Sequence, residues 1–369
     1  MAKTKQEEMS IMSKHCEKVA VLKNVLVTIM CTLVVIAVSS DSLLAEAKGV
    51  ATLSYWEDSA VAKTELTNYM AQITDENSAS YIPVEDRIAV FDLDGTLCCE
   101  TDPVYFDHEL LVYRVFGDPA YKDKATDFEK AVALKVVQYA ETGKYPEELS
   151  NEHGQAIASA FSGMTVDEFI QYVAAFKNTP MNGYTGMTKG EAFYQPMVQI
   201  VNYLQQNDFK VYIVSGTDRL ILRGLVEGEL NIPPSQIIGS DETIVSSTQN
   251  GADGLDYQFK DGDSLVLGGD FVVKNLKMNK VSAIAQEIGQ QPVLSFGNSS
   301  GDYSMAKYVV TGNKYKSLAF MLCCDDTVRE NGKLSSAEKM LNKCNENGWI
   351  PISMKNDWKT IYAEGVQRK

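Results

Sequence analysis

Two aspartates one residue apart, Asp92 and Asp94, directly follow a short apolar run. That run, residues 88–91, predicts a buried strand. Because side chains alternate along a strand, the two carboxylates should emerge on nearly the same side, and Gly95 then lets the backbone bend sharply. Two carboxylates this close raise each other's pKa unless a cation lies between them. A hard divalent cation with oxygen ligands would meet that need.

Three further segments carry candidate groups for an anion or a cation. Ser215 and Gly216 follow a second apolar strand, 210–214, where a hydroxyl and free N–H groups before a helix can bind an anion. Lys280 stands in the first turn of an amphipathic helix, 280–288, where a cation opposes the helix dipole unless it faces an anion. A third strand, 292–296, precedes a loop that contains Asn298 and Asp302. Lys274 and Lys277 are alternative candidates for the lysine that faces an anion.

These segments resemble, in order and rough spacing, the four motifs of the haloacid dehalogenase (HAD) superfamily. The strings are Asp-Leu-Asp-Gly-Thr at 92–96, Ser-Gly-Thr at 215–217, Lys280, and Gly-Asn-Ser-Ser-Gly-Asp at 297–302. The resemblance implies an α/β fold with a doubly wound, Rossmann-like parallel sheet and an inserted α-helical cap. In such sheets ligands bind beyond the carboxyl ends of the strands, so the segments should converge there.

The resemblance also implies roles for residues of this chain. Asp92 would be the nucleophile that attacks phosphorus, Asp94 the acid and base, and Lys280 the cation that offsets charge on the nucleophile and phosphate. Ser215 and the Gly216 N–H would hold the phosphoryl oxygens.

The implied cofactor is Mg²⁺, held by Asp92, Asp94 through its backbone carbonyl, and Asp302. The family's first acid of the fourth motif is replaced here by Asn298, whose amide can still ligate a metal or orient a water but brings no charge. Of Asn298 and Asp302, Asp302 is therefore the residue more strongly expected to ligate Mg²⁺.

The acid at position 94 separates reaction classes within the family. The dehalogenases lack an acid there and the ion-pumping ATPases carry a threonine, so Asp94 favours a phosphatase or a phosphomutase. An exported location, argued below, disfavours a mutase. The expected function is therefore Mg²⁺-dependent hydrolysis of a small phosphate ester through an aspartyl phosphate. The alternative is an exported binding protein with the same fold and weakened catalysis, which only Asn298 supports.

The motifs and cap resemble the phosphoserine and phosphorylcholine phosphatase branch. Glu100 lies near the position of a substrate-binding glutamate of the phosphoserine phosphatases, but one residue short of it. It could equally be a helix-start charge at residue 101. A quaternary ammonium would suit an aromatic cage, although aromatic side chains in helices more often belong to a core. The aromatic residues in question are Tyr105, Phe106, Tyr113, Phe116, Tyr172 and Tyr184.

The expected domains are a core of residues 48–97 and 210–369 and a cap of residues 98–209. The cap region has helical patterns at 104–116, 128–140 and 191–206. A further helix over 169–176 is preceded by the capping box Thr165-Val-Asp-Glu168. Residues 237–267 predict one or two hairpins beside the sheet.

Residues 1–47 predict a signal peptide or an N-terminal anchor. Five lysines lie within the first 23 residues, and residues 25–38 carry no charge. That apolar run would span roughly 21 Å as a helix, short of the ~30 Å hydrocarbon core. Ala45-Glu-Ala47 fits a cleavage site, so an exported protein, periplasmic or secreted, is expected. The only expected membrane contact is this segment, if it is not cleaved.

Composition excludes some partners. The 369 residues carry a formal charge of −15, which argues against a nucleic-acid partner, since such proteins need a basic face. Seven cysteines include no CxxC pair and no zinc-type spacing with the three histidines, so a structural zinc site is not expected. A disulfide from Cys323 or Cys324 to Cys344 is left open.

Overall fold

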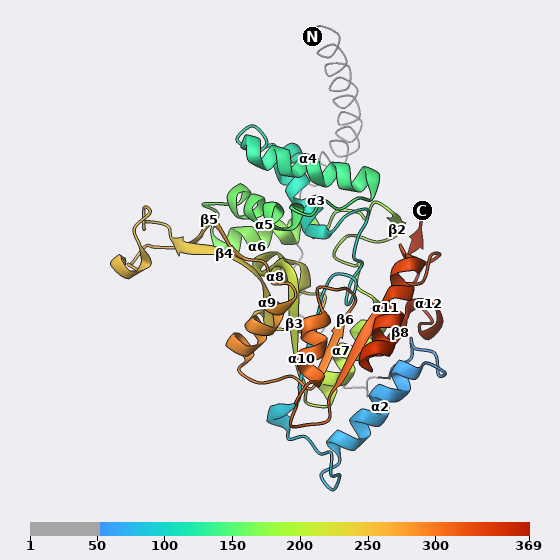
Figure 1. The fold of residues 1–369 in the computed structure, drawn as a ribbon. Helices are drawn as coiled ribbons and strands as arrows, with labels where there is room; N and C mark the ends of the chain where they lie inside the picture. The colour runs from blue at the N-terminus through green and yellow to red at the C-terminus, as the bar shows by residue number, and fades with distance from the viewer. Residues whose placement is uncertain (1–51) are drawn as a thin grey trace, which may run out of the picture.

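A seven-stranded sheet forms the centre of this computed structural model, which describes residues 52–369 (Figure 1). The strand order is β5-β4-β3-β1-β6-β7-β8, and all neighbours are parallel except β4 and β5. The predicted doubly wound α/β fold is confirmed. The strands are β1 (Ile88–Phe91), β3 (Lys210–Asp218), β4 (Ile237–Ser246), β5 (Leu265–Val273), β6 (Leu294–Gly297), β7 (Leu318–Cys323) and β8 (Ile350–Ser353).

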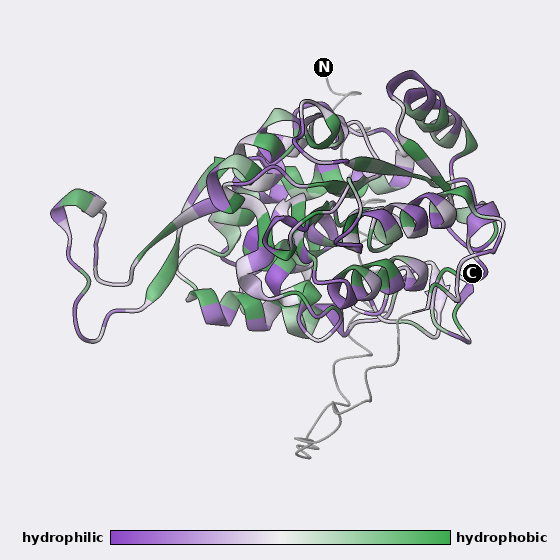
Figure 2. Ribbon diagram, turned by 90° about the horizontal axis from the view of Figure 1, so that it is seen from below, coloured by the Kyte–Doolittle hydropathy of each residue, from purple (hydrophilic) through white to green (hydrophobic). Residues whose placement is uncertain are grey.

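The central strands β1 and β7 are apolar because helices cover both faces of the sheet. Phe91 of β1 stacks on Phe296 of β6, which stacks on Phe320 of β7, with ring centroids 4.2 and 4.8 Å apart. Val90, which directly precedes Phe91 in the sequence, packs on the opposite face. The flanking helices are amphipathic, with hydrophobic sides turned inward (Figure 2). They are α2 (Val61–Thr74), α7 (Gln195–Gln206), α8 (Arg219–Val226), α9 (Met278–Ala283), α10 (Tyr303–Val310), α11 (Leu334–Asn347) and α12 (Met354–Asp357).

Four helices lie together above the carboxyl end of the sheet (Figure 1). They share one apolar cluster that includes Leu111, Val132, Phe161 and Phe169. The predicted capping box at Thr165 and Glu168 is formed, and the helix begins after it. The helices are α3 (Phe106–Val112), α4 (Asp127–Thr142), α5 (Leu149–Ala160) and α6 (Val166–Lys177).

The cap boundaries 98 and 209 stay a prediction. Within that range α7 packs with the sheet core rather than with α3–α6, since Met197, Ile200 and Leu204 belong to the core cluster. A short sheet of β2 (Tyr184–Thr185) and β9 (Gln367–Arg368) ties the end of the cap region to the C-terminus.

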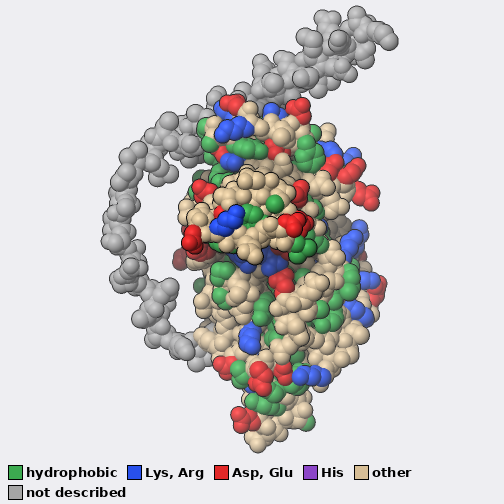
Figure 3. Space-filling view, turned by 90° about the vertical axis from the view of Figure 1, so that its left-hand side faces the viewer, with side chains coloured by type: hydrophobic (Ala, Val, Ile, Leu, Met, Phe, Trp, Pro, Cys, Tyr) green, Lys and Arg blue, Asp and Glu red, His purple; other side chains and the backbone are tan. Residues whose placement is uncertain are grey.

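The predicted hairpin is formed by β4 and β5, but it belongs to the seven-stranded sheet, through the pairing of β4 with β3, rather than lying beside it. Its far end projects from the molecule (Figure 1), and Leu255 near its tip is exposed. On the face that carries this hairpin, acidic and basic side chains are interspersed (Figure 3).

Several elements differ from expectation. The second strand runs on to Asp218 rather than ending at residue 214, because a register shift lets Asp218 pair with Ser240 of β4. Three elements, α5, α11 and β8, were not predicted from the sequence. Pro351 within β8 obscured a strand that lies at the sheet edge, where proline is tolerated.

Some predictions fall on the first 51 residues. The signal or anchor segment 1–47 lies outside the described residues. Within residues 52–369, no helix has the length and apolar character needed to cross a bilayer. The five cysteines of residues 52–369 are free thiols. The disulfide from Cys323 or Cys324 to Cys344, which the sequence left open, is therefore not formed in this structure.

The contact between cap and core is tight at Gly224 of α8. A Cβ there would lie 2.8 Å from the Val173 Cβ and 2.9 Å from the Ile170 carbonyl oxygen of α6. We expect Gly224→Ala to lower the free energy of unfolding by about 1–3 kcal/mol, because the backbone of α6 must move. Gly254→Ala, which meets open space, should change it by less than about 0.5 kcal/mol. Urea denaturation measures both, and equal stabilities would contradict this packing account.

Candidate active site

The ends of β1, β3 and β6 bring the predicted segments together beneath the cap. The Asp92 N–H donates to the Phe296 carbonyl oxygen at 2.9 Å, so the first aspartate directly extends the β1–β6 pairing. Gly95 has a φ of +76°, and a Cβ there would lie 2.0 Å from the Asn298 amide nitrogen. Glycine is therefore required both for the turn and for the close approach of the loop after β6.

Lys280 joins two of the predicted acids. Its Nζ donates to Asp92 Oδ1 and to Asp302 Oδ1, each at 2.6 Å, and its side chain is fully buried. The two competitors are elsewhere: Lys277 is exposed, and Lys274 lies across a small cavity from Asp107. The choice of Lys280 over its neighbours thus agrees with the structure. A buried ammonium between two carboxylates holds their relative positions.

Hydrogen bonds engage both oxygens of Asp302. Oδ1 accepts from Lys280, while Oδ2 accepts from the backbone N–H groups of Asn298 and Ser299 at 3.0 Å. Asp302 therefore fixes both the lysine and the loop. The Asn298 amide lies between Gly95 and Glu100, and its Oδ1 accepts weakly from the Thr96 hydroxyl at 3.4 Å.

Negative charge exceeds positive charge in this buried region. Burial, followed by the charge of Asp302, raises the pKa of Asp92 to about 7 despite the ammonium of Lys280. Burial, then Asp107 and Asp92, raises the pKa of Asp94 well above its usual value. Burial opposes the charge of Lys280, but Asp302 and Asp92 outweigh it and raise the lysine pKa. Oxygen donors with uncompensated negative charge are the set that a Mg²⁺ ion fits.

The second segment supplies a hydroxyl and an additional contact. Ser215 is buried, and its Oγ accepts from the Thr217 N–H at 3.2 Å. Thr217 Oγ1 in turn donates to Asp94 Oδ2 at 2.7 Å. Thr217 belongs to the second motif, but no role was predicted for it. Its partner Asp94 is 123 positions away, and no local pattern in the sequence indicates such a contact. Gly216 lies between them, and its carbonyl accepts from Ser240 Oγ at 2.7 Å.

Glu100 lies beside the acids rather than at a helix start, because α3 begins only at Phe106. The Tyr105 hydroxyl donates to Glu100 Oε1 at 3.1 Å. Burial raises the pKa of the Glu100 carboxyl, which in turn contributes to raising the pKa of Asp94. Of the two interpretations of Glu100, the structure favours a residue that faces the site.

The cap aromatics do not gather into one cage. Tyr184 donates to Glu330 in the core, whereas Tyr172 donates to Asp118 within the cap. Phe106 packs edge-on against Phe176. Tyr105 is hydrogen-bonded to Glu100, a candidate site residue. Most of these aromatic rings therefore contribute to packing rather than to a ligand-binding cage.

A family model described as haloacid dehalogenase-like hydrolase matches residues 89–307. The chain belongs to this family. The match spans all four motifs, so the predicted family and its hydrolase class are confirmed. No curated protein matches the sequence.

Solved structures of similar fold are distant in sequence. A conserved protein of unknown function from Anaerococcus prevotii DSM 20548 is 15% identical with a TM-score of 0.48, covering 83% of this chain and 97% of that one. Cytosolic 5'-nucleotidase IIIB bound to cytidine is 13% identical with a TM-score of 0.46, covering 80% and 86%. A probable phosphoserine phosphatase from Vibrio cholerae is 14% identical with a TM-score of 0.35, covering 70% and 68%.

The charge state of Asp92 makes folding stability depend on pH. Its pKa rises from 3.8 to about 7 on folding, so the folded protein holds a proton that the unfolded chain releases between these values. The stability from Asp92 is full below pH 3.8 and is lost as pH rises through about 7. Metal-stripped wild type should therefore lose up to about 4 kcal/mol relative to Asp92→Asn over this range.

Urea denaturation at successive pH values measures this difference. The exposed Asp261 provides the matched control. Asp261→Asn should follow the wild-type profile throughout, because the carboxyl that it removes is in water. Parallel profiles for wild type and Asp92→Asn would contradict the raised pKa.

Proposed function

We propose that the protein is a Mg²⁺-dependent phosphomonoesterase that acts through an aspartyl phosphate. The observation that carries the proposal is the arrangement of Asp92, paired with Lys280, next to Asp94, held by Thr217. A nucleophile and an acid with different partners sit on one turn, beneath a cap that can exclude water.

In the first step a carboxylate oxygen of Asp92 attacks phosphorus and the ester oxygen departs. The leaving oxygen takes a proton from Asp94, whose pKa is raised by burial and neighbouring charge, as suits a proton donor. Ser215 and the Gly216 N–H bind the phosphoryl oxygens. Lys280 holds Asp92 in line and offsets charge as it develops.

In the second step a water molecule cleaves the aspartyl phosphate. Asp94, now a carboxylate, takes a proton from that water. Inorganic phosphate is released and the carboxylate of Asp92 is regenerated. The Thr217 hydroxyl donates to Asp94 Oδ2 and so orients its carboxyl for both proton transfers.

Mg²⁺ would be held by Asp92, the backbone carbonyl of Asp94, and the loop after β6. Because Lys280 and two N–H groups engage both oxygens of Asp302, we place the Asn298 amide oxygen ahead of Asp302 as the direct ligand. When bound, the ion would neutralise phosphoryl charge and orient the substrate. The change from an acid to Asn298 predicts weaker metal affinity than a carboxylate would give.

The proposed substrate is a small phosphorylated metabolite such as phosphoserine or phosphocholine. Glu100, near the acids and bonded to Tyr105, suits the amine of phosphoserine. An exported location, with residues 1–47 as signal or anchor, remains part of this proposal. A panel of small phosphomonoesters, assayed with and without chelator, tests the substrate class.

Removing the nucleophile tests the proposal directly. Asp92→Asn should lower phosphate release from p-nitrophenyl phosphate by at least about 10³-fold, since nucleophile loss typically removes most of the acceleration. Asp261→Asn should retain wild-type turnover. Chelation of Mg²⁺ should abolish the turnover of the wild type. Wild type with no turnover on any phosphomonoester would support the alternative of a binding protein.

The role of Asp94 predicts a dependence on the leaving group. Asp94→Asn should lower turnover of an alkyl phosphate such as phosphoserine by about 10²–10⁴-fold, because its poor leaving group needs a proton. The loss on p-nitrophenyl phosphate, whose leaving group is stable as an anion, should be smaller in the first step. Single-turnover kinetics separates that step. Equal losses for both substrates would contradict the role of a general acid.

A further inference from the structure

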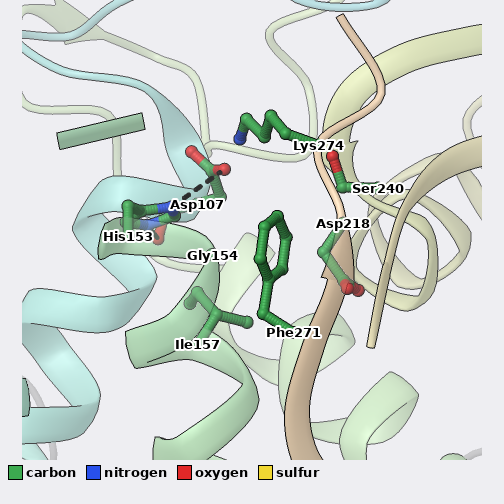
Figure 4. A pocket seen from close by; sticks show the side chains of 8 residues that line it. All are labelled: Asp107, His153, Gly154, Ile157, Asp218, Ser240, Phe271 and Lys274. Carbon is green, nitrogen blue, oxygen red and sulfur yellow. Dashed lines mark hydrogen bonds and ion pairs between the residues drawn. The ribbon is translucent and has the colours of Figure 1, made fainter. Parts of the chain in front are cut away.

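A small cavity lies where the cap meets the core. Its volume is about 10 Å³, enough for one water-sized occupant. Asp107 of α3 and His153 of α5 line the cap side, while Lys274 enters from the loop after β5 (Figure 4). Asp107 also contributes to the raised pKa of Asp94, so this cavity adjoins the proposed active site.

Three possible metal ligands lie together beside the cavity, and two of them, Asp107 and His153, line it. Donor atoms of Asp107, His108 and His153 all lie within 4.8 Å of one another. The three side chains are buried, with 5%, 3% and 1% of their surface exposed. Within residues 52–369 this is the one such group of three His, Cys, Asp or Glu residues. None of the three is the nucleophile, the acid, a phosphate-binding residue or a Mg²⁺ ligand in the proposed hydrolysis.

His153 is oriented as a metal ligand would be. Its Nε2 lies 3.2 Å from the Asp107 backbone oxygen, which can only accept, so Nε2 carries the hydrogen. Burial lowers the pKa of His153, which leaves Nδ1 with a lone pair. That Nδ1 faces Asp107 Oδ2 at 3.7 Å, beyond hydrogen-bond length. A metal-bound histidine typically donates its other N–H to a carbonyl in this way.

The spacing fits a cation between these two atoms. Two acceptors that face each other repel unless a proton or a cation lies between them. A tetrahedral zinc ion with bonds of about 2.1 Å holds its ligand atoms about 3.4 Å apart. The 3.7 Å between His153 Nδ1 and Asp107 Oδ2 is close to that value.

His108 supplies an independent observation. Its Nδ1 is buried and has no hydrogen-bond partner. The ring lies 4.3 Å from that of His153 and packs against Tyr105 and Tyr145. Burial, then the neighbouring His153, lowers the pKa of His108 to about 3, so the imidazole is neutral. Leaving a buried ring nitrogen unpaired is costly, and metal ligation through this nitrogen would remove that cost.

We propose that Asp107, His108 and His153 bind a divalent transition metal of the zinc class, with its fourth position open to the cavity. Two imidazoles and one carboxylate suit zinc rather than Mg²⁺, which prefers oxygen ligands. The site shares no residue with the proposed Mg²⁺ site. It fastens α3 to α5, two helices from separate parts of the sequence, next to Asp94.

Lys274 is the competing partner of Asp107. Its amine points toward the Asp107 carboxylate across the cavity (Figure 4). If this ammonium were the only counter-ion that Asp107 needs, no metal would bind. If a metal binds, Lys274→Met should keep or increase its affinity, because a nearby positive charge has been removed.

The test uses the full chain without a histidine tag, stripped with chelator and dialysed against Zn²⁺ or Co²⁺. We expect one equivalent of tightly bound metal by elemental analysis. His108→Gln and His153→Gln should each weaken binding at least about 100-fold, since even loss of an outer-shell partner costs 10–100-fold. Asp92→Asn and His15→Gln, at the only other histidine, should retain the metal.

A second measurement needs no variant. Co²⁺ in a four-coordinate nitrogen and oxygen site absorbs visible light far more strongly than aqueous Co²⁺, so the wild type should develop that spectrum at one equivalent. The absence of this spectrum would overturn the proposal. Unchanged Zn²⁺ affinity in folded His153→Gln would do the same.

Discussion

The pairing of buried Lys280 with Asp92 and Asp302 is the interaction on which the site depends. It ties the end of β1 to the loop after β6 and to α9, three segments far apart in sequence. Removing one member of such a buried set leaves an uncompensated charge, which typically costs 3–5 kcal/mol. The same contacts hold the carboxylate of Asp92, the proposed nucleophile, so the stability of the fold and the proposed chemistry depend on the same atoms.

The site remains electrostatically unbalanced, and that imbalance is informative. One ammonium faces several carboxylates, and burial together with this excess of negative charge raises the pKa values of Asp92 and Asp94. A raised pKa at Asp94 suits a proton donor, while the excess of oxygen donors suits a divalent cation. The cap contributes to this through Asp107, so α3 belongs to the electrostatics of the core site as well as to its cover.

Much of the fold and site could be predicted from sequence because the motifs follow apolar strands, and parallel strands end at one sheet edge. Asp92, Lys280 and Asp302 met as expected for that reason. Thr217 and the cluster around His153 could not be predicted, because their contacts join distant segments with no shared local pattern. β3 extended past residue 214 through a register shift with β4, which depends on pairing and not on local propensity.

The central claim is that Asp92 forms the covalent intermediate. The most direct measurement is rapid quenching of the enzyme during turnover of a phosphomonoester, followed by borohydride reduction and mass spectrometry of the peptide containing residues 88–97. The account predicts a modification characteristic of an aspartyl phosphate at Asp92, present with substrate and absent without it. Steady turnover with no modification, or with modification at another residue, would contradict it.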